Sequence, residues 1–133
     1  MKQIDVAIGV VKRDGRILIC QRKSEDTFGG LWEFPGGKLE PGEALEDCLS
    51  REMMEELAIE VKVVKKLTII SHQYPRSRVT LHPFLCGHAG GEPRAIECQQ
   101  FKWVKAEELK EHAFPPANES LVTEIIQEGQ LDG

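Results

Sequence analysis

The sequence predicts a single folded domain of the α/β (α+β) class, with helices packed on the faces of a mixed β-sheet. Three observations support this prediction. The chain has 133 residues, which is the size of one ordinary domain. Apolar residues make up 41% and charged residues 29%, as in soluble globular proteins. Strand-like and helix-like segments alternate along the chain, but without the regular repetition of βαβ units.

The first half of the chain is expected to contain a β-hairpin, a loop and a helix. Two β-branched, apolar runs at 4–11 and 16–21 flank an Asp-Gly pair at 14–15, a combination typical of tight hairpin turns. The Gly- and Pro-rich segment that runs from 29–30 through 35–37 to 41–42 is expected to be a loop. The stretch 43–58 lacks Gly and Pro and is rich in helix formers, so it predicts the first helix.

The second half is expected to supply more strands and two short helices. The expected strands are 60–71, 78–87 and 98–104, and the expected helices lie near 106–111 and 119–128. No internal repeat, low-complexity tract or long linker interrupts these elements. Residues 1–133 are therefore interpreted as one domain.

Charge and cysteine usage argue against several classes of function. The net charge of -5 argues against nonspecific binding of nucleic acid, because a polyanion is held by a basic surface. No apolar run is long enough for a membrane span or a secretory leader, so we expect a cytoplasmic protein. Neither the four cysteines nor the four histidines have a metal-ligand spacing, and the cysteines are expected to be buried and reduced.

The most informative segment is the first helix, where an apolar stripe becomes acidic. At about 100° per residue, the stripe that ends at Leu49 continues through Glu52 and Glu56, and Glu55 lies beside them. Like charges at this spacing repel by roughly 0.2 to 0.5 kcal/mol per pair, a cost that a bound divalent cation such as Mg²⁺ offsets. The alternative is a solvated acidic face on which Arg51 and Glu55 form an ordinary i, i+4 pair. The position of the glutamates on the apolar stripe favours a metal site.

These residues belong to a 23-residue segment, 37–59, that resembles the Nudix box. The matching positions are Gly37, Glu43, Arg51, Glu52, Met53, Glu55, Glu56 and Ile59. One position departs, because Ala58 stands where the family usually has a glycine that ends the helix in a left-handed conformation. Alanine is disfavoured there by roughly 1 kcal/mol. We expect a small shift of the helix end and no loss of chemistry.

The resemblance extends over nearly the whole chain, to the MutT-like branch of this family. It is carried by the segments 21–22, 31–38, 72–75 and 114–119. The resemblance implies an α/β/α sandwich around a mixed sheet. It also implies a magnesium-dependent hydrolase, with Mn²⁺ as a possible substitute, that cuts oxidised purine nucleoside triphosphates such as 8-oxo-dGTP. The products would be the monophosphate and pyrophosphate, so the implied role is sanitation of the nucleotide pool.

The family's metal and catalytic roles can be assigned to individual residues of this chain. The residues that match the family's metal ligands are Gly36 and Gly37, through backbone carbonyls, and Glu52, Glu55 and Glu56. Arg51 is implied to orient the carboxylates, and Glu43 to brace the loop against the helix. Glu52 is the first candidate for the general base. Glu97 is the second, since similar enzymes carry a glutamate six residues before a tryptophan; it could equally be a polar residue at a strand start.

Four residues are candidates for contacting the substrate, each with a simpler alternative. Arg22 matches an arginine that contacts the nucleotide, although it could be a solvated residue at a strand end. Glu33 and Phe34 match the segment that lines the base pocket, although Phe34 could be core. Asn118 matches an asparagine that recognises the base, although its position before the last helix also suits an N-cap. The Arg-Ser-Arg segment at 76–78 departs from the acidic and basic pair of close MutT relatives.

Two further functions stay open at this point. A closely similar branch of the family acts on pyrimidines, so CTP or a modified dCTP is the alternative substrate. A noncatalytic nucleotide-sensing module on the same fold is the second alternative. Binding modules commonly lose the box glutamates, whereas Glu52, Glu55 and Glu56 are all present, which favours the enzyme. The expected partner is a small nucleotide, without nucleic acid or membrane, and the protein is expected to be either a monomer or a homodimer.

Overall fold

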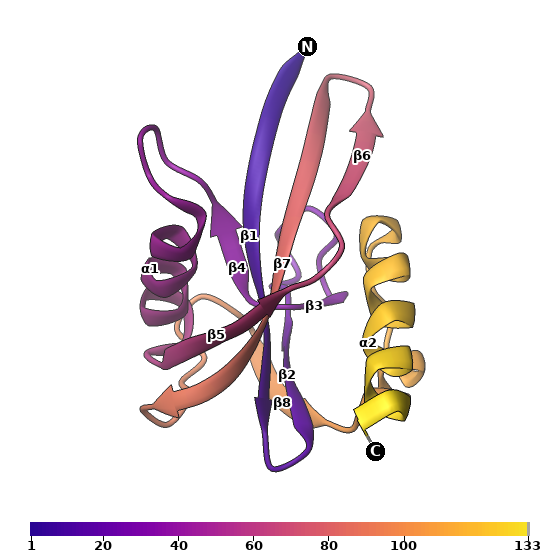
Figure 1. The fold of residues 1–133 in the computed structure, drawn as a ribbon. Coiled ribbons are helices and arrows are strands. Elements are labelled where there is room, and N and C mark those ends of the chain that lie inside the picture. The colour runs from indigo at the N-terminus through magenta and orange to yellow at the C-terminus, as the bar shows by residue number, and fades with distance from the viewer. Residues whose placement is uncertain (133) are drawn as a thin grey trace.

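The computed structural model describes residues 1–132, with side chains described for residues 1–128. A β-sheet forms the middle layer, and α1 (Leu45–Leu57) and α2 (Glu119–Asp132) cover its two faces (Figure 1). The α/β/α arrangement expected from the resemblance is therefore confirmed. None of the described helices is long and apolar enough to cross a membrane.

The sheet has eight strands and a mixed topology. The strands are β1 (Lys2–Arg13), β2 (Arg16–Gln21), β3 (Trp32–Glu33), β4 (Gly36–Lys38), β5 (Glu60–Lys66), β6 (Ile70–Tyr74), β7 (Ser77–Gly90) and β8 (Gln100–Val104). The main order is β3-β2-β1-β7-β5, with β4 paired to β1, β6 to β7, and β8 to β2. Strands β1 and β7 run parallel, whereas the other pairs are antiparallel.

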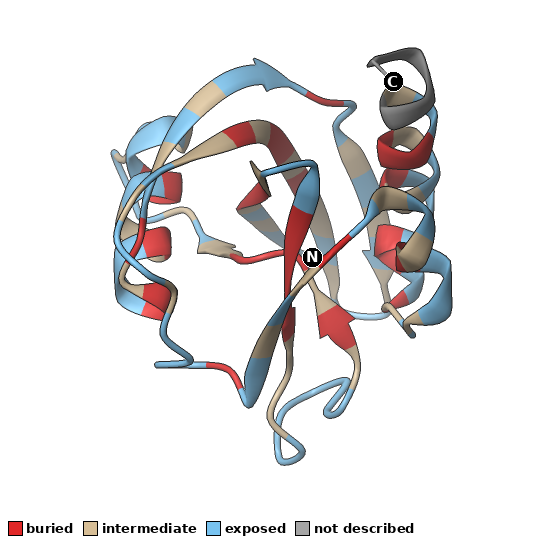
Figure 2. Ribbon diagram, turned by 90° about the horizontal axis from the view of Figure 1, so that it is seen from below, coloured by how far each residue is buried: buried red, intermediate tan, exposed pale blue. Residues whose placement is uncertain are grey.

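The core consists of two apolar layers, one on each side of the sheet. Alternating residues of β1 contribute to both layers, because successive side chains of a strand point to opposite faces. Ala7 and Val11 pack with the buried side of α1, whereas Ile8 and Val10 pack with the buried side of α2. Figure 2 shows the buried residues of both helices turned toward the sheet. Each helix is thus fixed by a separate apolar layer.

The strand expected over 60–71 is two strands, and Pro83 explains the break. Strand β5 pairs with β7 as far as Phe84, and β6 begins pairing with β7 at Leu81. Pro83 lies between them and has no N–H to donate to the ladder, although its carbonyl accepts from Leu67 N at 2.9 Å. The side chain of Glu124 on α2 accepts from the backbone N–H of Thr68 at 3.1 Å, which fixes the short connection.

The Gly- and Pro-rich segment is not the simple loop that its composition predicts. It contains β3 and β4, and β4 pairs with the middle of β1. A Cβ on Gly36 would lie 2.0 Å from the backbone oxygen of Ala7, so only glycine allows the two strands to approach this closely. Strand β4 is therefore held beside β1 in the sheet, and it also contacts α1.

The ends of the helices differ in detail from the expectation. Helix α1 begins at Leu45, so Glu43 precedes it, and its N-cap Ala44 makes no side-chain cap. At the other end Ala58 itself adopts the left-handed conformation (φ 58°, ψ 36°), and its N–H bonds to the carbonyls of Met53 and Met54. The expected shift of the helix end was wrong, because alanine accepts the conformation that glycine usually takes. Two 3₁₀ helices, η1 (Ala106–Glu111) and η2 (Pro116–Asn118), precede α2.

Candidate active site

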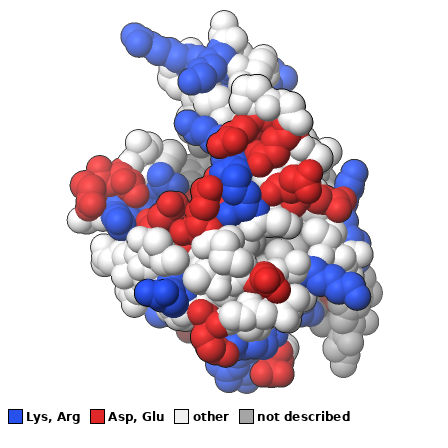
Figure 3. All heavy atoms as spheres, turned by 90° about the vertical axis from the view of Figure 1, so that its left-hand side faces the viewer, with Lys and Arg blue, Asp and Glu red and all other residues white. Residues whose placement is uncertain are grey.

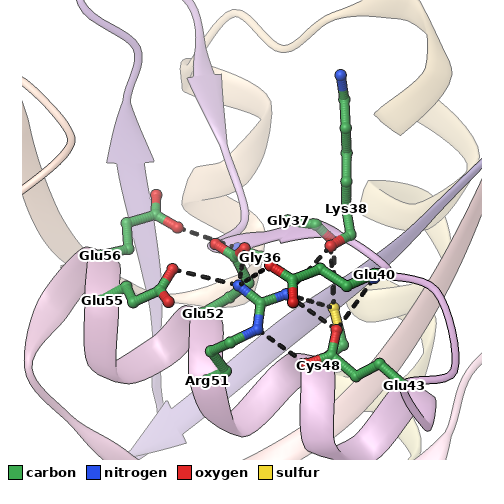
Figure 4. Close-up of polar contacts among 10 residues, drawn as sticks. All are labelled: Gly36, Gly37, Lys38, Glu40, Glu43, Cys48, Arg51, Glu52, Glu55 and Glu56. Carbon is green, nitrogen blue, oxygen red and sulfur yellow. Dashed lines mark hydrogen bonds and ion pairs between the residues drawn. The ribbon is translucent and has the colours of Figure 1, made fainter.

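Arg51 on α1 is the centre of a charged network that joins the helix to the preceding loop (Figure 4). Its Nε and Nη2 donate to both carboxylate oxygens of Glu43, at 2.8 and 2.9 Å. Its Nη1 donates to Glu52 at 2.9 Å and to Glu55 at 3.2 Å. The hydrogen bonds from Arg51 to Glu43 lower the pKa of Glu43 to about 2. Arg51 therefore orients two carboxylates and ties them to the loop that carries Glu43.

Glu56 is a buried carboxylate at the end of the acidic stripe. Its side chain accepts a hydrogen bond from the backbone N–H of Gly36 at 3.2 Å, and the residue is only 6% exposed. Burial, reinforced by the nearby charge of Glu33, raises the pKa of Glu56 to about 8 in the metal-free protein. Within residues 1–128, no Lys, Arg or His side chain is bonded to the Glu56 carboxylate. A cation beside Glu56 would favour its ionised form, so this buried acid suits a metal ligand.

Glu52 lies directly against the backbone of Gly37. A Cβ on Gly37 would lie 2.2 Å from Cδ of Glu52, so the glycine leaves the space that this carboxylate occupies. Burial is the largest cause of a raised pKa for Glu52, hydrogen bonding to Arg51 opposes it, and the charges of Glu55 and Glu97 add to it. Glu97 is exposed on the loop before β8, and its N–H bonds to the carbonyl of Glu56 at 3.4 Å. The structure thus brings both candidate bases to the same end of α1.

The carboxylates of Glu52, Glu55 and Glu56 lie on the face of the molecule that carries α1. Figure 3 shows acidic side chains gathered around basic atoms on that face. Glu55 is more exposed than Glu52, with 48% of its side chain accessible against 15%. Within residues 1–128, no three Asp, Glu, His or Cys side chains already converge at metal-ligating distance. Arg51 bonds one carboxylate oxygen of Glu52 and one of Glu55, so the second oxygen of each carboxylate makes no bond to Arg51.

The four candidate substrate residues fall on opposite faces of the sheet. Trp32 and Phe34 pack in the core layer under α2, so the intervening Glu33 points to the α1 side. There it accepts from Arg22 at 2.8 Å, and its charge acts on Glu56. That Glu33 and Phe34 line one base pocket stays a prediction, and this alternation places their two side chains on opposite faces of the sheet. Arg22 also donates to the carbonyl of Thr27 at 2.7 Å, which fixes the loop between β2 and β3.

Phe34 and Asn118 lie on the side of the sheet covered by α2. Phe34 stacks on Phe114, with ring centroids 5.2 Å apart. Asn118 is 8% exposed, and its backbone N–H donates to the carbonyl of Pro115 at 2.9 Å. No hydrogen bond involves its side-chain amide within the part of the chain whose side chains are described, so the expected N-cap bond is not found there. The amide keeps its donors and acceptor for another partner.

Sequence reasoning missed the contacts of the cysteines near the network. The Cys48 thiol donates toward the carbonyls of Gly37 and Lys38, at 3.6 and 3.5 Å, and so joins α1 to β4. Burial raises its pKa to about 11. The interaction between the thiols of Cys20 and Cys98 raises the pKa of Cys20 and lowers that of Cys98. No spacing in the sequence signals either interaction, because the partners come from different elements.

Comparison with known proteins places the chain in a family. The NUDIX domain family model matches residues 6–124. The CTP pyrophosphohydrolase of Escherichia coli K12 is 36% identical over 118 residues, which cover 89% of this chain and 87% of that protein. The 8-oxo-dGTP diphosphatase of Haemophilus influenzae is 34% identical over 128 residues, covering 96% of this chain and 94% of the relative. The E. coli 8-oxo-dGTP diphosphatase is 31% identical, with coverages of 94% and 98%.

Solved structures agree with the sequence comparison. The E. coli ORF135 protein superimposes with a TM-score of 0.81 at 34% identity, covering 92% of this chain and 88% of that one. MutT from methicillin-resistant Staphylococcus aureus 252 gives a TM-score of 0.79 at 32% identity, with coverages of 96% and 99%. Nudix hydrolases generally use divalent metal cations. The chain therefore belongs to the NUDIX domain family, and it is a Nudix hydrolase similar to MutT proteins.

Proposed function

We propose that the protein hydrolyses oxidised purine deoxynucleoside triphosphates, with 8-oxo-dGTP as the representative substrate, to the monophosphate and pyrophosphate. The observation that carries the proposal is the set of carboxylates around Arg51, in which a buried Glu56 and an oriented Glu52 lie against Gly36 and Gly37. The names of several relatives support the substrate, since they are 8-oxo-dGTP diphosphatases. On this proposal the cellular role is sanitation of the nucleotide pool.

The residues at the end of α1 fit a magnesium site. The ligands would be the side chains of Glu52, Glu55 and Glu56 and backbone oxygens of Gly36 and Gly37. A hard cation prefers such oxygen donors, and the missing Cβ of Gly37 leaves room for Glu52 beside the backbone. Bound Mg²⁺ would neutralise charge on the phosphate oxygens, and Mn²⁺ would substitute for it. Ligation would also relieve the cost of ionising Glu56 in its buried position.

The chain's own carboxylates would handle the proton of the attacking water. Glu52 is the first candidate for the base, because burial raises its pKa toward the range in which a carboxylate accepts a proton effectively. Glu97 is the second candidate, and its charge acts on Glu52 across the site. Water would attack phosphorus in the triphosphate chain so that the bond between the α- and β-phosphates breaks. Arg51 would keep Glu52 and Glu55 in position without touching the substrate.

We assign recognition of the base to the side of the sheet that α2 covers. Phe34, which is buried against Phe114, would support an apolar wall of the base site from behind, and Asn118 would use its amide to distinguish an oxidised purine from a normal one. Arg22 would contact the nucleotide only by giving up its bonds to Glu33 or Thr27, so its first role is to position that loop. We retain Arg22 as a substrate contact to be tested. Glu33 is better assigned to the surroundings of Glu56.

A second candidate substrate is a cytidine nucleotide, either CTP or a modified dCTP. The specific observation in its favour is the 36% identity to the E. coli CTP pyrophosphohydrolase over most of both chains. The Arg-Ser-Arg segment at 76–78 also departs from the pattern of close MutT relatives. A noncatalytic nucleotide sensor is disfavoured because the box glutamates are intact. The proposal further places a monomer or homodimer in the cytoplasm, with no nucleic acid or membrane partner.

A substrate panel tests the proposal directly. The protein is incubated with Mg²⁺ and 8-oxo-dGTP, dGTP, CTP, dCTP or 5-methyl-dCTP, and pyrophosphate and phosphate are measured separately. The expected result is pyrophosphate release with the highest kcat/KM for 8-oxo-dGTP. The double variant Glu52→Gln, Glu56→Gln controls for contaminating phosphatase. Preference for a cytidine nucleotide would establish the second candidate, while release of phosphate alone would contradict the assigned cut. Tight nucleotide binding without turnover would point to the sensor.

A further inference from the structure

The loop between β2 and β3 presents a large apolar side chain in a backbone conformation that does not suit it. Phe28 has a φ of 60°, in the left-handed region that bulky residues rarely adopt. Asp14 and Ala58, the other non-glycine residues with positive φ within residues 1–132, have smaller side chains. Phe28 is also 40% exposed, so its ring is only partly packed against the protein. A residue that is both strained and exposed is a candidate for contact with a ligand.

Hydrogen bonds on both sides of Phe28 hold the loop in this conformation. The N–H of Gly29 donates to the carbonyl of Asp26 at 2.9 Å, and the N–H of Leu31 donates to the carbonyl of Phe28 at 3.1 Å. A Cβ on Gly29 would lie 2.3 Å from the carbonyl oxygen of Ser24, so the chain folds tightly back on itself at that point. The loop around Phe28 therefore imposes its left-handed conformation, and the backbone that carries the ring is positioned before any ligand binds.

One end of the loop is joined to the proposed metal site. The guanidinium of Arg22 donates from Nε to the carbonyl of Thr27 at 2.7 Å and from Nη1 to the carboxylate of Glu33 at 2.8 Å. Three residues after Glu33, the N–H of Gly36 donates to the carboxylate of Glu56 at 3.2 Å. A single guanidinium therefore links the residue that precedes the exposed phenylalanine to the segment that contacts the buried acid.

The other end of the loop is joined to the proposed base site. Directly after the loop, the N–H of Trp32 donates to the carbonyl of Ala113 at 2.8 Å. The residue after Ala113, Phe114, stacks on Phe34 with ring centroids 5.2 Å apart. A nucleotide with its phosphates at the metal site and its base near Phe34 would therefore span the two attachments of the loop 22–31.

We propose that Phe28 is a nucleotide-binding residue whose ring stacks on the face of the bound nucleobase. The proposal rests on the proposed function, because it requires a nucleotide at the site. Stacking on an aromatic ring is available to every base, since every base has a π-face. Phe28 would therefore add affinity for purine and pyrimidine nucleotides alike, whereas hydrogen bonding by Asn118 would discriminate between bases. The strain in the free loop is the cost of presenting the ring in advance.

Two substitutions separate the strain from the loss of the ring. Phe28→Gly removes the ring and accepts the positive φ, whereas Phe28→Ala removes the ring and keeps the unfavourable conformation. In thermal unfolding, the glycine variant should therefore melt about 2 to 5 °C above the alanine variant. Val64, which is 63% exposed in β5 and has no positive φ, provides the matched control, and there glycine should melt below alanine. A Phe28→Ala protein at least as stable as Phe28→Gly would overturn the argument from strain.

Steady-state kinetics test the stacking with the triphosphates that the parent hydrolyses. Phe28→Ala and Phe28→Gly should both raise KM between about 5- and 100-fold with little change in kcat, the size expected for the loss of one stacked base. The increase should be similar for 8-oxo-dGTP and CTP, so the preference between them should persist. Phe28→Tyr should keep the parental KM, and Val64→Ala should behave like the parent. Parental KM in Phe28→Ala, or a loss confined to kcat, would overturn the proposal.

Calorimetry gives a readout that does not depend on turnover. With Mn²⁺ present, dGMP should bind Phe28→Ala between about 5- and 100-fold more weakly than the parent, whereas pyrophosphate, which has no base, should bind both proteins equally. A parent without turnover whose dGMP affinity falls in this way on substitution would count against the proposed function alone. Equal dGMP affinity in the two proteins, binding to neither, or an equal loss of pyrophosphate affinity would overturn the role of Phe28.

Discussion

Replacing Gly37 by alanine should stop turnover without unfolding the protein. The new Cβ would lie 2.2 Å from Cδ of Glu52 and 2.4 Å from both of its carboxylate oxygens. A normal contact requires about 3.5 Å, so the carboxylate must move by at least about 1 Å. Misplacement on this scale costs on the order of 100-fold in rate. The displaced atoms are the end of a flexible side chain, so the backbone need not move.

The neighbouring glycine provides the matched control. A Cβ on Gly36 would lie 2.0 Å from the carbonyl oxygen of Ala7, in the middle of β1, and this backbone has no room to move. Overpacking of this kind typically costs about 1 to 3 kcal/mol or more. Gly36→Ala should therefore melt about 5 to 10 °C or more below the parent. Gly37→Ala loses at most the Arg51–Glu52 ion pair, a smaller loss than a clash with the backbone of β1.

The assay combines thermal unfolding by circular dichroism with turnover and Mn²⁺ affinity, all on freshly purified protein. Gly37→Ala should melt within about 5 °C of the parent and show weak metal binding and greatly reduced turnover. Parental turnover and Mn²⁺ affinity in Gly37→Ala would refute the reasoning, because they would mean that the position of Glu52 is irrelevant. A Gly36→Ala protein as stable as the parent would refute the steric account of β4.

Three further predictions concern single positions. The pKa of Glu56 is raised from 4.5 to about 8, so the folded metal-free protein keeps a proton that the unfolded chain loses; its stability should fall as pH rises from about 4.5 to 8. Glu56→Gln should remove this decline when melting temperature is measured against pH, and it should also remove metal affinity and activity. An unchanged slope of melting temperature against pH would contradict the raised pKa of Glu56. Ala58→Gly should raise stability by up to about 1 kcal/mol, measured by urea unfolding, because Ala58 has a positive φ; a destabilised variant would contradict this. Asn118→Asp and Asn118→Ala should both lose preference for 8-oxo-dGTP over dGTP with little change in stability, since the Asn118 side chain makes no hydrogen bond within residues 1–128. An aspartate variant with full preference would remove Asn118 from base recognition.

The regular elements were predictable where one local pattern determines them. The hairpin of β1 and β2 follows from an Asp-Gly turn between apolar runs, and α1 follows from a run of helix formers with an apolar stripe. Strands β3 and β4 were not predictable, because their pairing depends on contacts with β2 and β1 that are distant in sequence. The break between β5 and β6 depends in the same way on Pro83 of the facing strand.

The candidate site was predictable where its residues share one helix. The spacing of Glu52, Glu55 and Glu56 places them together, and Arg51 lies within reach of two of them. The side of the sheet on which Glu33 lies could be found only after β3 was known to be a strand, since alternation then separates it from Phe34. The interaction between Cys20 and Cys98 depends on the path of the loop before β8, for which the sequence contains no local signal.

The separation of Glu33 and Phe34 by the sheet has a consequence for how such an enzyme can change over evolutionary time. On the proposed assignment of base recognition to the α2 side, substitutions under α2 would alter the surface offered to a base without touching the carboxylates on the other face. A lineage can therefore acquire a new substrate through a series of intermediates that all remain active. Such a history would leave relatives that resemble this chain to a similar degree, some named as purine enzymes and others as pyrimidine enzymes.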